Sequence, residues 1–593
     1  MDDDNRTPLH RAALHGGTRT VRLLLANGVV IEALDEDRNT ALHLAVWKRH
    51  IDVAQLLLDK GAFIRATNKY LNTPLHLAAW NGHIDMVELL LARGASIEAR
   101  NITYKTPLHL TTLRGHIGTA ELLLKKGASI EAYIWPINTL LHVATWGGYT
   151  DIVKLLLGKG ASIEEVNSKR KTPLHSAAKN GHTGVVELLL GEGASIEPLD
   201  DSRATPLHCA ASKGHIAVVE LLLGKGASIE EVNSKGKTPL HSAAKNGHTG
   251  VVELLLGEGA SIEPLDESRA TPLHYAASYG RVGVVELLLS KGASIEKDGF
   301  WGRRTPLHCA AQNGHTRVVE LLLGEGASIE PPNNSRTTPL HYAASKGNIG
   351  VVELLLSKGA SIEPPDNSRS TPLHCAASHG HIDVVELLLS KGASIEPRDN
   401  SSATPLHYAA YYGHIGVVEL LLSKGASIEK DGFFRDTNPL HYAAANGQTG
   451  TVKLLLAEGA SIEAFSLHSE TPLHFATEGG HTDTVELLLR QGASIEAKNG
   501  FGHTPLNLAI EHGRTDTVEL LLRQGASIEA TNRFDQTPLH FALECGHTGI
   551  VELLLRQGAS TEGEMLQALL ADYGYWEFPT LGCPKTTKRQ AKD

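Results

Sequence analysis

The 593-residue chain has little of what marks membrane, secreted and nucleic-acid-binding proteins. No apolar run approaches the roughly 20 residues of a membrane-spanning helix, so we expect no insertion into a bilayer. The acidic start, MDDDNRTPLH, lacks the apolar stretch of a secretory signal, which favours an intracellular protein, cytoplasmic or nuclear. The net charge of −11 is spread along the sequence, and nothing resembles the clustered Lys/Arg face that nucleic acid requires, so we expect no direct binding of nucleic acid.

Cysteine is scarce, at five residues, and the number is odd. Cys209, Cys309 and Cys375 hold one equivalent position in repeats that are not adjacent. Repeats stacked about 10 Å apart would place the nearest of their Cα atoms roughly 20 Å apart, beyond the reach of a disulfide. We therefore expect reduced thiols, as in intracellular proteins.

The motifs of common enzymes are missing as well. We find no G-x-S-x-G, H-E-x-x-H, C-x-x-C or kinase signature, and Glu231 stands where a phosphate loop ending in GKT at 236–238 needs its first glycine. Of the 32 histidines, 27 are copies at two fixed repeat positions, which diverge along the repeat axis instead of converging on one ion. We expect no enzyme activity, no metal and no cofactor.

Repetition is what the chain has in abundance. The block KTPLHSAAKNGHTGVVELLLGEGASIE occupies 171–197 and returns unchanged at 237–263. T-P-L-H occurs 13 times and four variants fill the gaps, which gives 17 repeats spaced by 33 residues apart from two steps of 34. The longer segments around this block differ only at Arg170 and Gly236. Such periodicity indicates structural parts made to be stacked.

Each repeat predicts two short helices. In the copy at 238–263, Thr238 and Pro239 are typical of a helix start, and Gly247 of its end. The apolar residues at 251–256 predict a second helix with one buried face. Both helices are shorter than the ~12–15 residues that an isolated helix needs, so each repeat must be covered by its neighbours.

The pattern T-P-L-H-x-A-A-x-x-G-H-x-x-V-V-E-L-L-L-x-x-G-A resembles the ankyrin repeat. The resemblance implies an all-α ankyrin-repeat solenoid over 1–563, with stacked helix pairs, projecting β-hairpin-like loops and T-P-L-H histidines that brace the turns. The near-uniform GASIE linkers look most like long arrays of fungal interaction proteins. Ankyrin arrays mostly bind other proteins, through loop tips and the concave face of the first helices.

Three departures from the pattern carry expectations of their own. Arg49 replaces the glycine that ends a first helix, which should cost about 1 kcal/mol if the backbone there is left-handed. Asn507 replaces the turn histidine, which predicts a weaker repeat. After Gly563 the pattern stops, and 564–593 predicts a capping helix over the last repeat followed by a short basic tail.

The repeats differ most at the two residues after the Ala-Ala pair and in the turns before each T-P-L-H, and the resemblance places both regions on the contact surface. The first residue after the pair is large and apolar in several repeats. Trp47, Trp80 and Trp146 hold this position in three early repeats, with Leu113 in the repeat between, and Tyr411 holds it further on. We predict that these residues bind a partner, because large aromatic side chains dominate interface energetics. Packing of the rings between helices is the alternative.

Two longer turns, at 297–304 and 430–437, account for the steps of 34 residues. Each contains Asp-Gly, which favours a tight hairpin with adjacent aromatic residues near its tip. These are Phe300, Trp301, Phe433 and Phe434. Exposed adjacent aromatics favour partner contact, and folding onto the neighbouring loop is the alternative.

The sequence therefore predicts a monomeric, non-enzymatic scaffold or adaptor that binds partner proteins. One alternative is a transcriptional coregulator that docks a DNA-binding protein, which the basic tail KTTKRQAKD weakly favours. Another is a substrate-recruiting adaptor for ubiquitin ligation, which needs a recruiting helix at one end, and we recognise no such box in 564–593.

Overall fold

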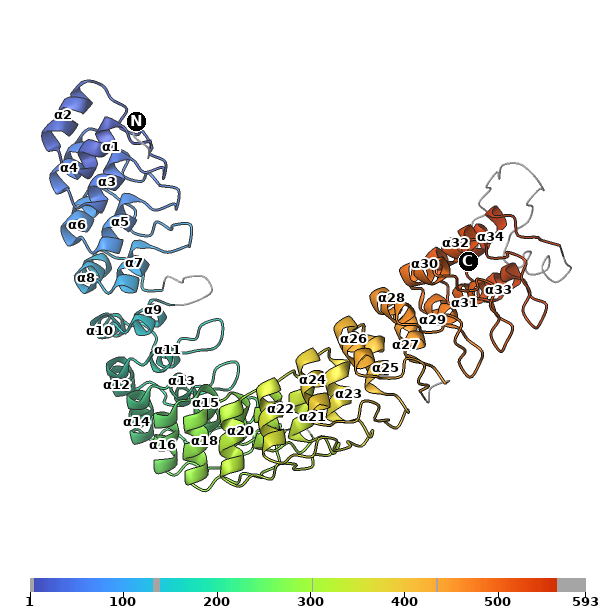
Figure 1. Cartoon of the computed structure of the whole chain (residues 1–593). Coiled ribbons are helices and arrows are strands. Elements are labelled where there is room, and N and C mark those ends of the chain that lie inside the picture. Colours follow the sequence, from blue (N-terminus) through green and yellow to red (C-terminus); the bar gives the residue numbers. More distant parts are fainter. Residues whose placement is uncertain (1–4, 132–138, 301, 433–435, 563–593) are drawn as a thin grey trace, which may run out of the picture. The chain divides into compact units, whose positions relative to one another are not determined.

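The computed structural model describes residues 5–131, 139–300, 302–432 and 436–562, and these contain 34 α-helices and no β-strand. The chain divides into two compact units, an N-terminal unit of Met1–Trp301 and a C-terminal unit of Gly302–Asp593. Within each unit the first helices of successive repeats form one row, the second helices form another, and the loops project from the first row (Figure 1). In the described ranges no helix combines the length and the apolar character needed to cross a membrane.

The first helices of the N-terminal unit are α1 (Pro8–Leu14), α3 (Ala41–Trp47), α5 (Pro74–Asn81), α7 (Pro107–Arg114), α9 (Leu140–Gly147), α11 (Pro173–Asn180), α13 (Pro206–Lys213), α15 (Pro239–Asn246) and α17 (Pro272–Ser278). Its second helices are α2 (Thr18–Ala26), α4 (Ile51–Asp59), α6 (Ile84–Ala92), α8 (Ile117–Lys125), α10 (Thr150–Gly158), α12 (Thr183–Gly191), α14 (Ile216–Gly224), α16 (Thr249–Gly257) and α18 (Val282–Ser290).

The first helices of the C-terminal unit are α19 (Pro306–Gln312), α21 (Pro339–Ser345), α23 (Pro372–Ser378), α25 (Pro405–Tyr412), α27 (Pro439–Ala445), α29 (Pro472–Gly479), α31 (Pro505–Glu511) and α33 (Pro538–Glu544). Its second helices are α20 (Thr316–Gly324), α22 (Ile349–Ser357), α24 (Ile382–Ser390), α26 (Ile415–Ser423), α28 (Thr449–Ala457), α30 (Thr482–Arg490), α32 (Thr515–Arg523) and α34 (Thr548–Arg556). The predicted capping helix in 564–593 lies outside the described residues.

The predicted course of one repeat is confirmed in the copy that starts at Thr238. Thr238 has the extended backbone of an N-cap, Pro239 is the first residue of α15, and Gly247 ends it in the left-handed region with φ 84°. The second helix, α16, buries Leu255 completely and exposes Glu253. The all-α architecture of stacked helix pairs follows from the predicted pattern.

In most repeats the turn histidine links its own repeat to the next one. In this repeat Nδ1 of His241 lies 3.2 Å from the backbone N of Thr238 and 3.0 Å from its hydroxyl oxygen. Nε2 donates to the carbonyl of Ala270 in the following turn, at 3.0 Å. A carbonyl only accepts, so the proton is on Nε2 and Nδ1 accepts from Thr238. The predicted local brace is thus also a bridge between repeats.

The same bridge recurs along both units, with Nε2 to carbonyl oxygen distances of 2.8 to 3.3 Å. It joins His10 to Asn39, His43 to Asn72, His76 to Lys105, His142 to Lys171, His175 to Ala204, His208 to Lys237, His308 to Thr337, His341 to Ser370, His374 to Ala403, His407 to Thr437, His441 to Glu470 and His474 to His503.

A second donor, just before most second helices, reaches the last turn of the first helix in the preceding repeat. His116 donates through Nε2 to the carbonyl of Trp80 at 3.0 Å, and His182 to that of Trp146 at 2.9 Å. Carbonyls at a helix end lack a partner within the helix, so these side chains complete the C-terminus. The G-H motif is therefore a cap supplied by the next repeat.

The uniform GASIE linkers form a third connection. Oε1 of Glu164 accepts the backbone N–H of Ser195 at 2.7 Å, and Glu463 holds Ser494 in the same way at 2.6 Å. Since the acceptor and the N–H come from successive linkers, an identical sequence in every repeat satisfies both. This explains why the linker varies so little.

The described loop tips form no strand ladder and are closed by side chains together with short backbone turns, such as the bond from the Asp266 N–H to the Ala270 carbonyl at 3.1 Å. Oδ1 of Asp266 accepts the backbone N–H groups of Ser268 and Ala270, each at 2.9 Å, and the N–H of Glu267 donates to the carbonyl of Lys235 in the preceding tip at 3.1 Å. These are Asx turns, in which a carboxylate or amide mimics a backbone acceptor. The hairpin-like loops of the resemblance are present in this form.

The longer turn at 297–304 has three described residues with a left-handed backbone, Phe300, Gly302 and Arg303. The other described tips carry one such residue, at a fixed position. At this position Gly236 has φ 68°, whereas Arg170 has φ 52° and Arg203 has φ 55°. Arg49, which replaces a helix-ending glycine, also has a left-handed backbone, at φ 63°, and its side chain pairs with Asp85 at 3.0 Å. A side chain in this region is strained, and the Asx turn holds the tip in place against that strain.

Asn507 keeps only half of the histidine bridge. Its Oδ1 accepts from the backbone N and the hydroxyl of Thr504, at 3.0 and 2.9 Å. Its Nδ2 is buried without a hydrogen-bond partner among the described residues, because the amide is too short to reach the next turn. This is the physical basis of the weak repeat that the sequence predicts.

We therefore expect Asn507→His to stabilise this repeat, because imidazole Nε2 would reach the carbonyl of Gln536 and the unpartnered donor would be removed. The gain should be about 1–3 kcal/mol, seen as slower amide hydrogen exchange in α31 and α33. The matched reverse change, His474→Asn, should cost a similar amount in α29 and α31. Faster exchange after Asn507→His would contradict the bridge as the cause.

The pair Arg170 and Gly236 offers a test within nearly identical surroundings. Arg170→Gly should stabilise its repeat by about 1 kcal/mol, because glycine adopts the left-handed region without steric cost. Gly236→Arg should destabilise, since a Cβ there would lie 2.8 Å from the backbone N of Glu267. Urea unfolding checks both changes, and effects of the same sign would show that the tip geometry does not set them.

Acid should unfold the array through its buried histidines. Removal from water lowers the pKa of His43, His76, His407, His441 and His474 to about 4, which outweighs the opposing effect of their carbonyl partners. In the unfolded chain these rings titrate near 6.5, so below that pH the unfolded state takes up protons first. Stability is complete above 6.5 and is lost as the pH falls toward 4, by about 1.4 kcal/mol per pH unit for each ring.

Circular dichroism should therefore show a steep fall in melting temperature between about pH 6.5 and about pH 4. The repeat of Asn507 has no titrating group at this position, so its loss of hydrogen-exchange protection should be smaller than that of the repeat of His474. A melting temperature that stays constant over this interval would show that the rings do not titrate with unfolding.

Candidate functional site

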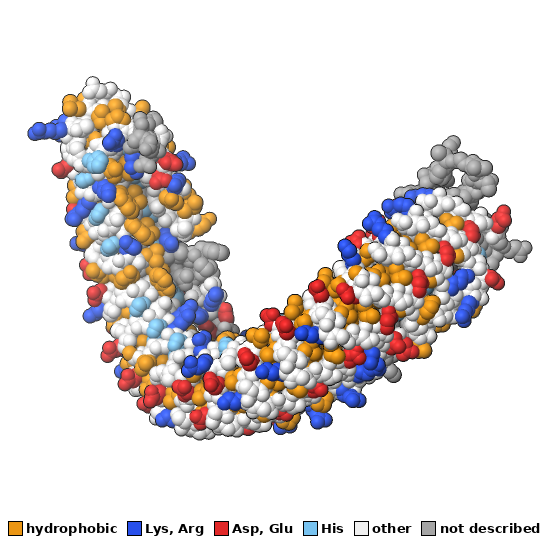
Figure 2. Space-filling view, viewed as in Figure 1, with side chains coloured by type: hydrophobic (Ala, Val, Ile, Leu, Met, Phe, Trp, Pro, Cys, Tyr) orange, Lys and Arg blue, Asp and Glu red, His pale blue; other side chains and the backbone are white. Residues whose placement is uncertain are grey.

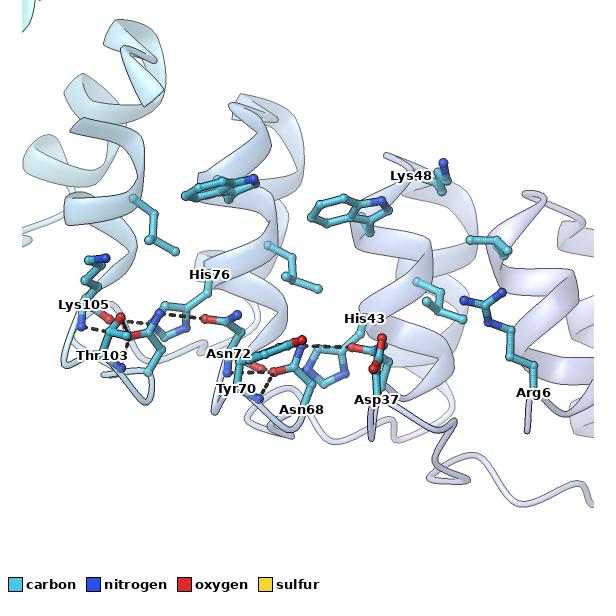
Figure 3. A pocket seen from close by; sticks show the side chains of 18 residues that line it. Arg6, Asp37, His43, Lys48, Asn68, Tyr70, Asn72, His76, Thr103 and Lys105 are labelled. Atoms are coloured by element: carbon cyan, nitrogen blue, oxygen red, sulfur yellow. Dashed lines mark hydrogen bonds between the residues drawn. The ribbon is translucent and has the colours of Figure 1, made fainter. Parts of the chain in front are cut away.

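The structure places the first of the predicted contact residues in one groove of the N-terminal unit. This groove, hereafter the first groove, has a volume of about 800 Å³ and lies between the first helices α1, α3, α5 and α7 and the tips beside them. Trp47 and Trp80 line it, together with Leu14, Leu44 and Leu77. In Figure 3, Arg6 and Lys105 lie at its opposite ends.

A second groove follows along the same row of helices. It has a volume of about 420 Å³, and Leu113, Val143 and Trp146 form its apolar part. Lys105 lines both grooves. The four predicted positions in the early repeats thus fall into two neighbouring grooves. Figure 2 shows hydrophobic side chains gathered along the N-terminal unit, with Lys and Arg side chains beside them.

The aromatic rings in these grooves are partly open to solvent. Trp47 is 40% exposed and Trp146 is 59% exposed, so neither ring is buried between helices. Trp80 is half-buried, and the guanidinium of Arg114 lies 4.7 Å from the centre of its ring, a cation–π contact. Each ring therefore packs against the protein with one part and exposes the rest to solvent.

The backbone that carries these rings is fixed by the next repeat. The carbonyls of Trp80 and Trp146 accept from His116 and His182, as described above, and the carbonyl of Leu113 accepts from the hydroxyl of Tyr149 at 3.2 Å. At these three positions the side chain differs while the contact of the backbone carbonyl stays the same. Such preorganisation lowers the entropic cost of binding.

The floor of the first groove is a row of amides from successive tips. Nδ2 of Asn68 donates to Oδ1 of Asn39 at 3.0 Å, and Nδ2 of Asn101 donates to Oδ1 of Asn72 at 2.9 Å. Oδ1 of Asn68 also accepts the backbone N–H of Tyr70 at 3.0 Å, which sets the direction of an exposed ring (Figure 3). These tips are ordered by their own hydrogen bonds.

The contact residues predicted from the sequence did not include Leu14 or the tip residues Asn68, Tyr70 and Lys105. Leu14 follows the Ala12-Ala13 pair and so occupies the same position as the tryptophans, which was a usable signal. The tip residues fall in the variable turns before T-P-L-H, but their spacing alone does not tell which of them face the helices.

The predicted aromatic contacts at the longer turns have a different setting. Phe300 is half-buried and packs edge-on against His274 and Tyr275 of α17, with ring centres 5.8 and 5.6 Å apart. The other three predicted residues, Trp301, Phe433 and Phe434, lie outside the described residues. For Phe300, packing within its own unit is what the structure shows.

Tyr411 lies on α25 of the C-terminal unit and is 39% exposed. Its ring centre is 4.9 Å from that of Tyr412 and 6.2 Å from that of Tyr442, in edge-to-face arrangements. This aromatic cluster is a separate feature from the two grooves.

The titratable groups beneath the first groove are neutral at physiological pH. His43 and His76 line it, and burial lowers the pKa of both to about 4. Both nitrogens of each ring are already hydrogen-bonded, so neither ring offers a free base or metal ligand. What this arrangement offers is a fixed apolar surface with charged and amide groups at its edges, which is suited to binding.

Comparison with known proteins agrees with this architecture. A family model described as ankyrin repeats in three copies matches residues 1–68, 75–167, 141–233, 225–299, 296–366, 362–432, 429–499 and 491–564, and one for many copies matches 48–91. The crystal structure of the human ASB11 ankyrin repeat domain is similar, with 34% identity over 38% of this chain and 99% of that chain, at a TM-score of 0.35. No curated protein matches the chain. Since ankyrin-repeat models match nearly its whole length, the chain belongs to the ankyrin repeat family.

Proposed function

We propose that this chain is a non-enzymatic scaffold or adaptor that holds a partner protein in the two grooves of its N-terminal unit. Ankyrin repeats indicate a protein–protein interaction module. The observation that carries the finer proposal is the pair Trp47 and Trp80, which line one groove with their rings partly accessible and their helices fixed by neighbouring repeats. Partly exposed tryptophans in a concave, preformed surface are typical anchors of an interface.

The roles of the groove residues follow from their chemistry. Trp47, Trp80, Leu113 and Trp146 supply the apolar contact area, and the tip amides supply directed hydrogen bonds at its edge. Tyr411, with its neighbouring tyrosines, is an accessory contact in the C-terminal unit. We also assign partner contact to Trp301, Phe433 and Phe434, whereas Phe300 supports its turn from within.

The scaffold acts as a monomer inside the cell in this proposal. The cysteines of the described residues, Cys209, Cys309, Cys375 and Cys545, are all free thiols, which suits a reducing compartment. The alternatives of a coregulator or a ubiquitin-ligation adaptor depend on residues 564–593, and no contact in the described part of the chain favours either.

Trp80→Ala should weaken partner binding far more than it lowers the melting temperature. Loss of a tryptophan anchor costs about 2 kcal/mol or more, which is about 30-fold in affinity. Partners are first identified by affinity purification and mass spectrometry, with wild type compared to a Trp47/Trp80/Trp146 triple alanine variant. Calorimetry and thermal unfolding then measure Trp80→Ala alone.

Phe63→Ala is the matched control, because Phe63 lies in the same unit, is 60% exposed and lines neither groove. It should leave binding unchanged. If Trp80→Ala lowers the melting temperature strongly while the affinity is retained, Trp80 belongs to the packing of the frame and the proposed anchor is wrong.

A further inference from the structure

The second groove has a charge opposite to that of the whole chain. Four lysines line it, and its described lining contains no carboxylate, whereas the chain carries a net charge of −11. The four are Lys105, Lys169, Lys171 and Lys179. Residues 132–138, outside the described ranges, contain no charged residue in the sequence. The groove is therefore a local basic site around an apolar centre.

Most of these cations are not neutralised within the chain. Lys171 pairs with Asp200, with Nζ 3.5 Å from a carboxylate oxygen. Lys105, Lys169 and Lys179 form no ion pair with any described residue. Lys105 is half-buried between the two grooves, where a charge without a partner is less well solvated than at an open surface.

The first groove is also lined by more basic than acidic side chains. Its lining contains one carboxylate among the described residues, Asp37, and this carboxylate is already paired with Lys69. Lys48 stands on the helix side of the groove (Figure 3) and has no ion pair in the described structure. Arg114 lies over Trp80. Cations thus accompany the apolar rings along both grooves.

The fold does not require cations at this position. The position that Lys179 occupies in the sixth repeat is occupied by glutamate in the last three repeats, by Glu478, Glu511 and Glu544. All of them occupy the same place after the first-helix Ala pair or its equivalent. The lysines of the N-terminal grooves are consequently not needed to form the repeat fold.

We propose that the occupant of these grooves is an acidic peptide segment with bulky apolar side chains. The inference rests on the proposed function and adds the chemistry of the partner. Carboxylates of the segment pair with Lys105, Lys169 and Lys179, while its apolar side chains lie on Trp47, Trp80, Leu113 and Trp146. Complementary charge fixes the register of such a segment and raises its rate of association.

A nucleic acid is a different class of ligand with the same sign of charge. The apolar lining favours a peptide, because Leu44, Leu77, Leu113 and Val143 offer aliphatic surface, whereas single-stranded nucleic acid is bound mainly by stacking on aromatic rings. A second copy of the chain is the other alternative, through its own glutamate-bearing repeats.

The test is selection of a random peptide display library on the full-length protein. Enriched peptides should be rich in Asp and Glu and should contain large apolar residues. Their affinity should fall about tenfold or more in the groove variant Lys105→Gln/Lys169→Gln/Lys179→Gln, because the variant removes the charges opposite the peptide. It should also fall between about 0.1 M and about 1 M salt, since the Debye length shrinks from about 10 Å to about 3 Å.

The matched control is Lys358→Gln/Lys391→Gln/Lys424→Gln, which removes the same charge from three exposed lysines after second helices of the C-terminal unit. It should leave peptide binding unchanged, and circular dichroism should show that both variants fold. An equal loss of binding in both variants would overturn the proposed site, because net charge alone would then be responsible.

The remaining outcomes separate the two proposals. Enriched peptides that are neutral or basic, and that bind wild type and the groove variant equally but lose affinity with Trp80→Ala, overturn the acidic occupant and leave the proposed function standing. Peptides that tolerate Trp80→Ala and the groove variant alike overturn the proposed function itself. Two further measurements complete the test, fluorescence anisotropy with an oligothymidine probe and sedimentation of the protein alone. If wild type binds the probe and the groove variant does not, a nucleic acid replaces the peptide as the occupant. If wild type self-associates and the groove variant does not, a second copy of the chain replaces it.

Discussion

The buried hydrogen-bond bridge from a turn histidine to the next repeat is the interaction on which the rest of the structure depends. Helices of eight and nine residues, such as α15 and α16, do not persist alone, so they need contacts that a neighbour supplies. His241 meets this need with both ring nitrogens, one for its own turn and one for the carbonyl of Ala270. Burial keeps the ring neutral, which is the protonation state that the bridge requires, because a protonated Nδ1 could not accept from Thr238.

The second connection shows that the fold selects a chemical capacity and not one residue type. The donor that reaches back to the end of the preceding first helix is usually a histidine, as at His116. Tyr149, Arg281, Asn348 and Gln448 take its place elsewhere and still donate to the equivalent carbonyl, at 2.9 to 3.2 Å. A repeat can therefore change this residue without loss of the contact, provided that the side chain is long enough and carries an N–H or O–H group.

The sequence was sufficient for the helix pairs, their ends and the equivalence of the variable positions, because these depend on local patterns that recur in every repeat. The sequence was not sufficient for contacts that depend on the relative positions of neighbouring loop tips. The bridge from Nε2 of a histidine spans about one repeat and has no local signature. Phe300 shows the same limit: the sequence left partner contact and local folding of the ring as alternatives, and only the structure places the ring on His274 and Tyr275. Likewise, the sharing of Lys105 by two grooves requires the geometry of the tips.

The contacts that hold the repeats together do not involve the variable side chains, which explains how one array can present opposite charges at equivalent positions. The next repeat holds the variable residue through its backbone carbonyl, as at Trp80, Trp146 and Lys179. The side chain at that position is not part of this contact, so it can change from tryptophan to lysine to glutamate while the helix end stays fixed. Stability then places no constraint on the sign of the charge at this position, so the proposed partner can determine which charge stands there, as with Lys179. A repeat protein built in this way can change its binding surface one repeat at a time, because each change leaves the bridges on either side intact.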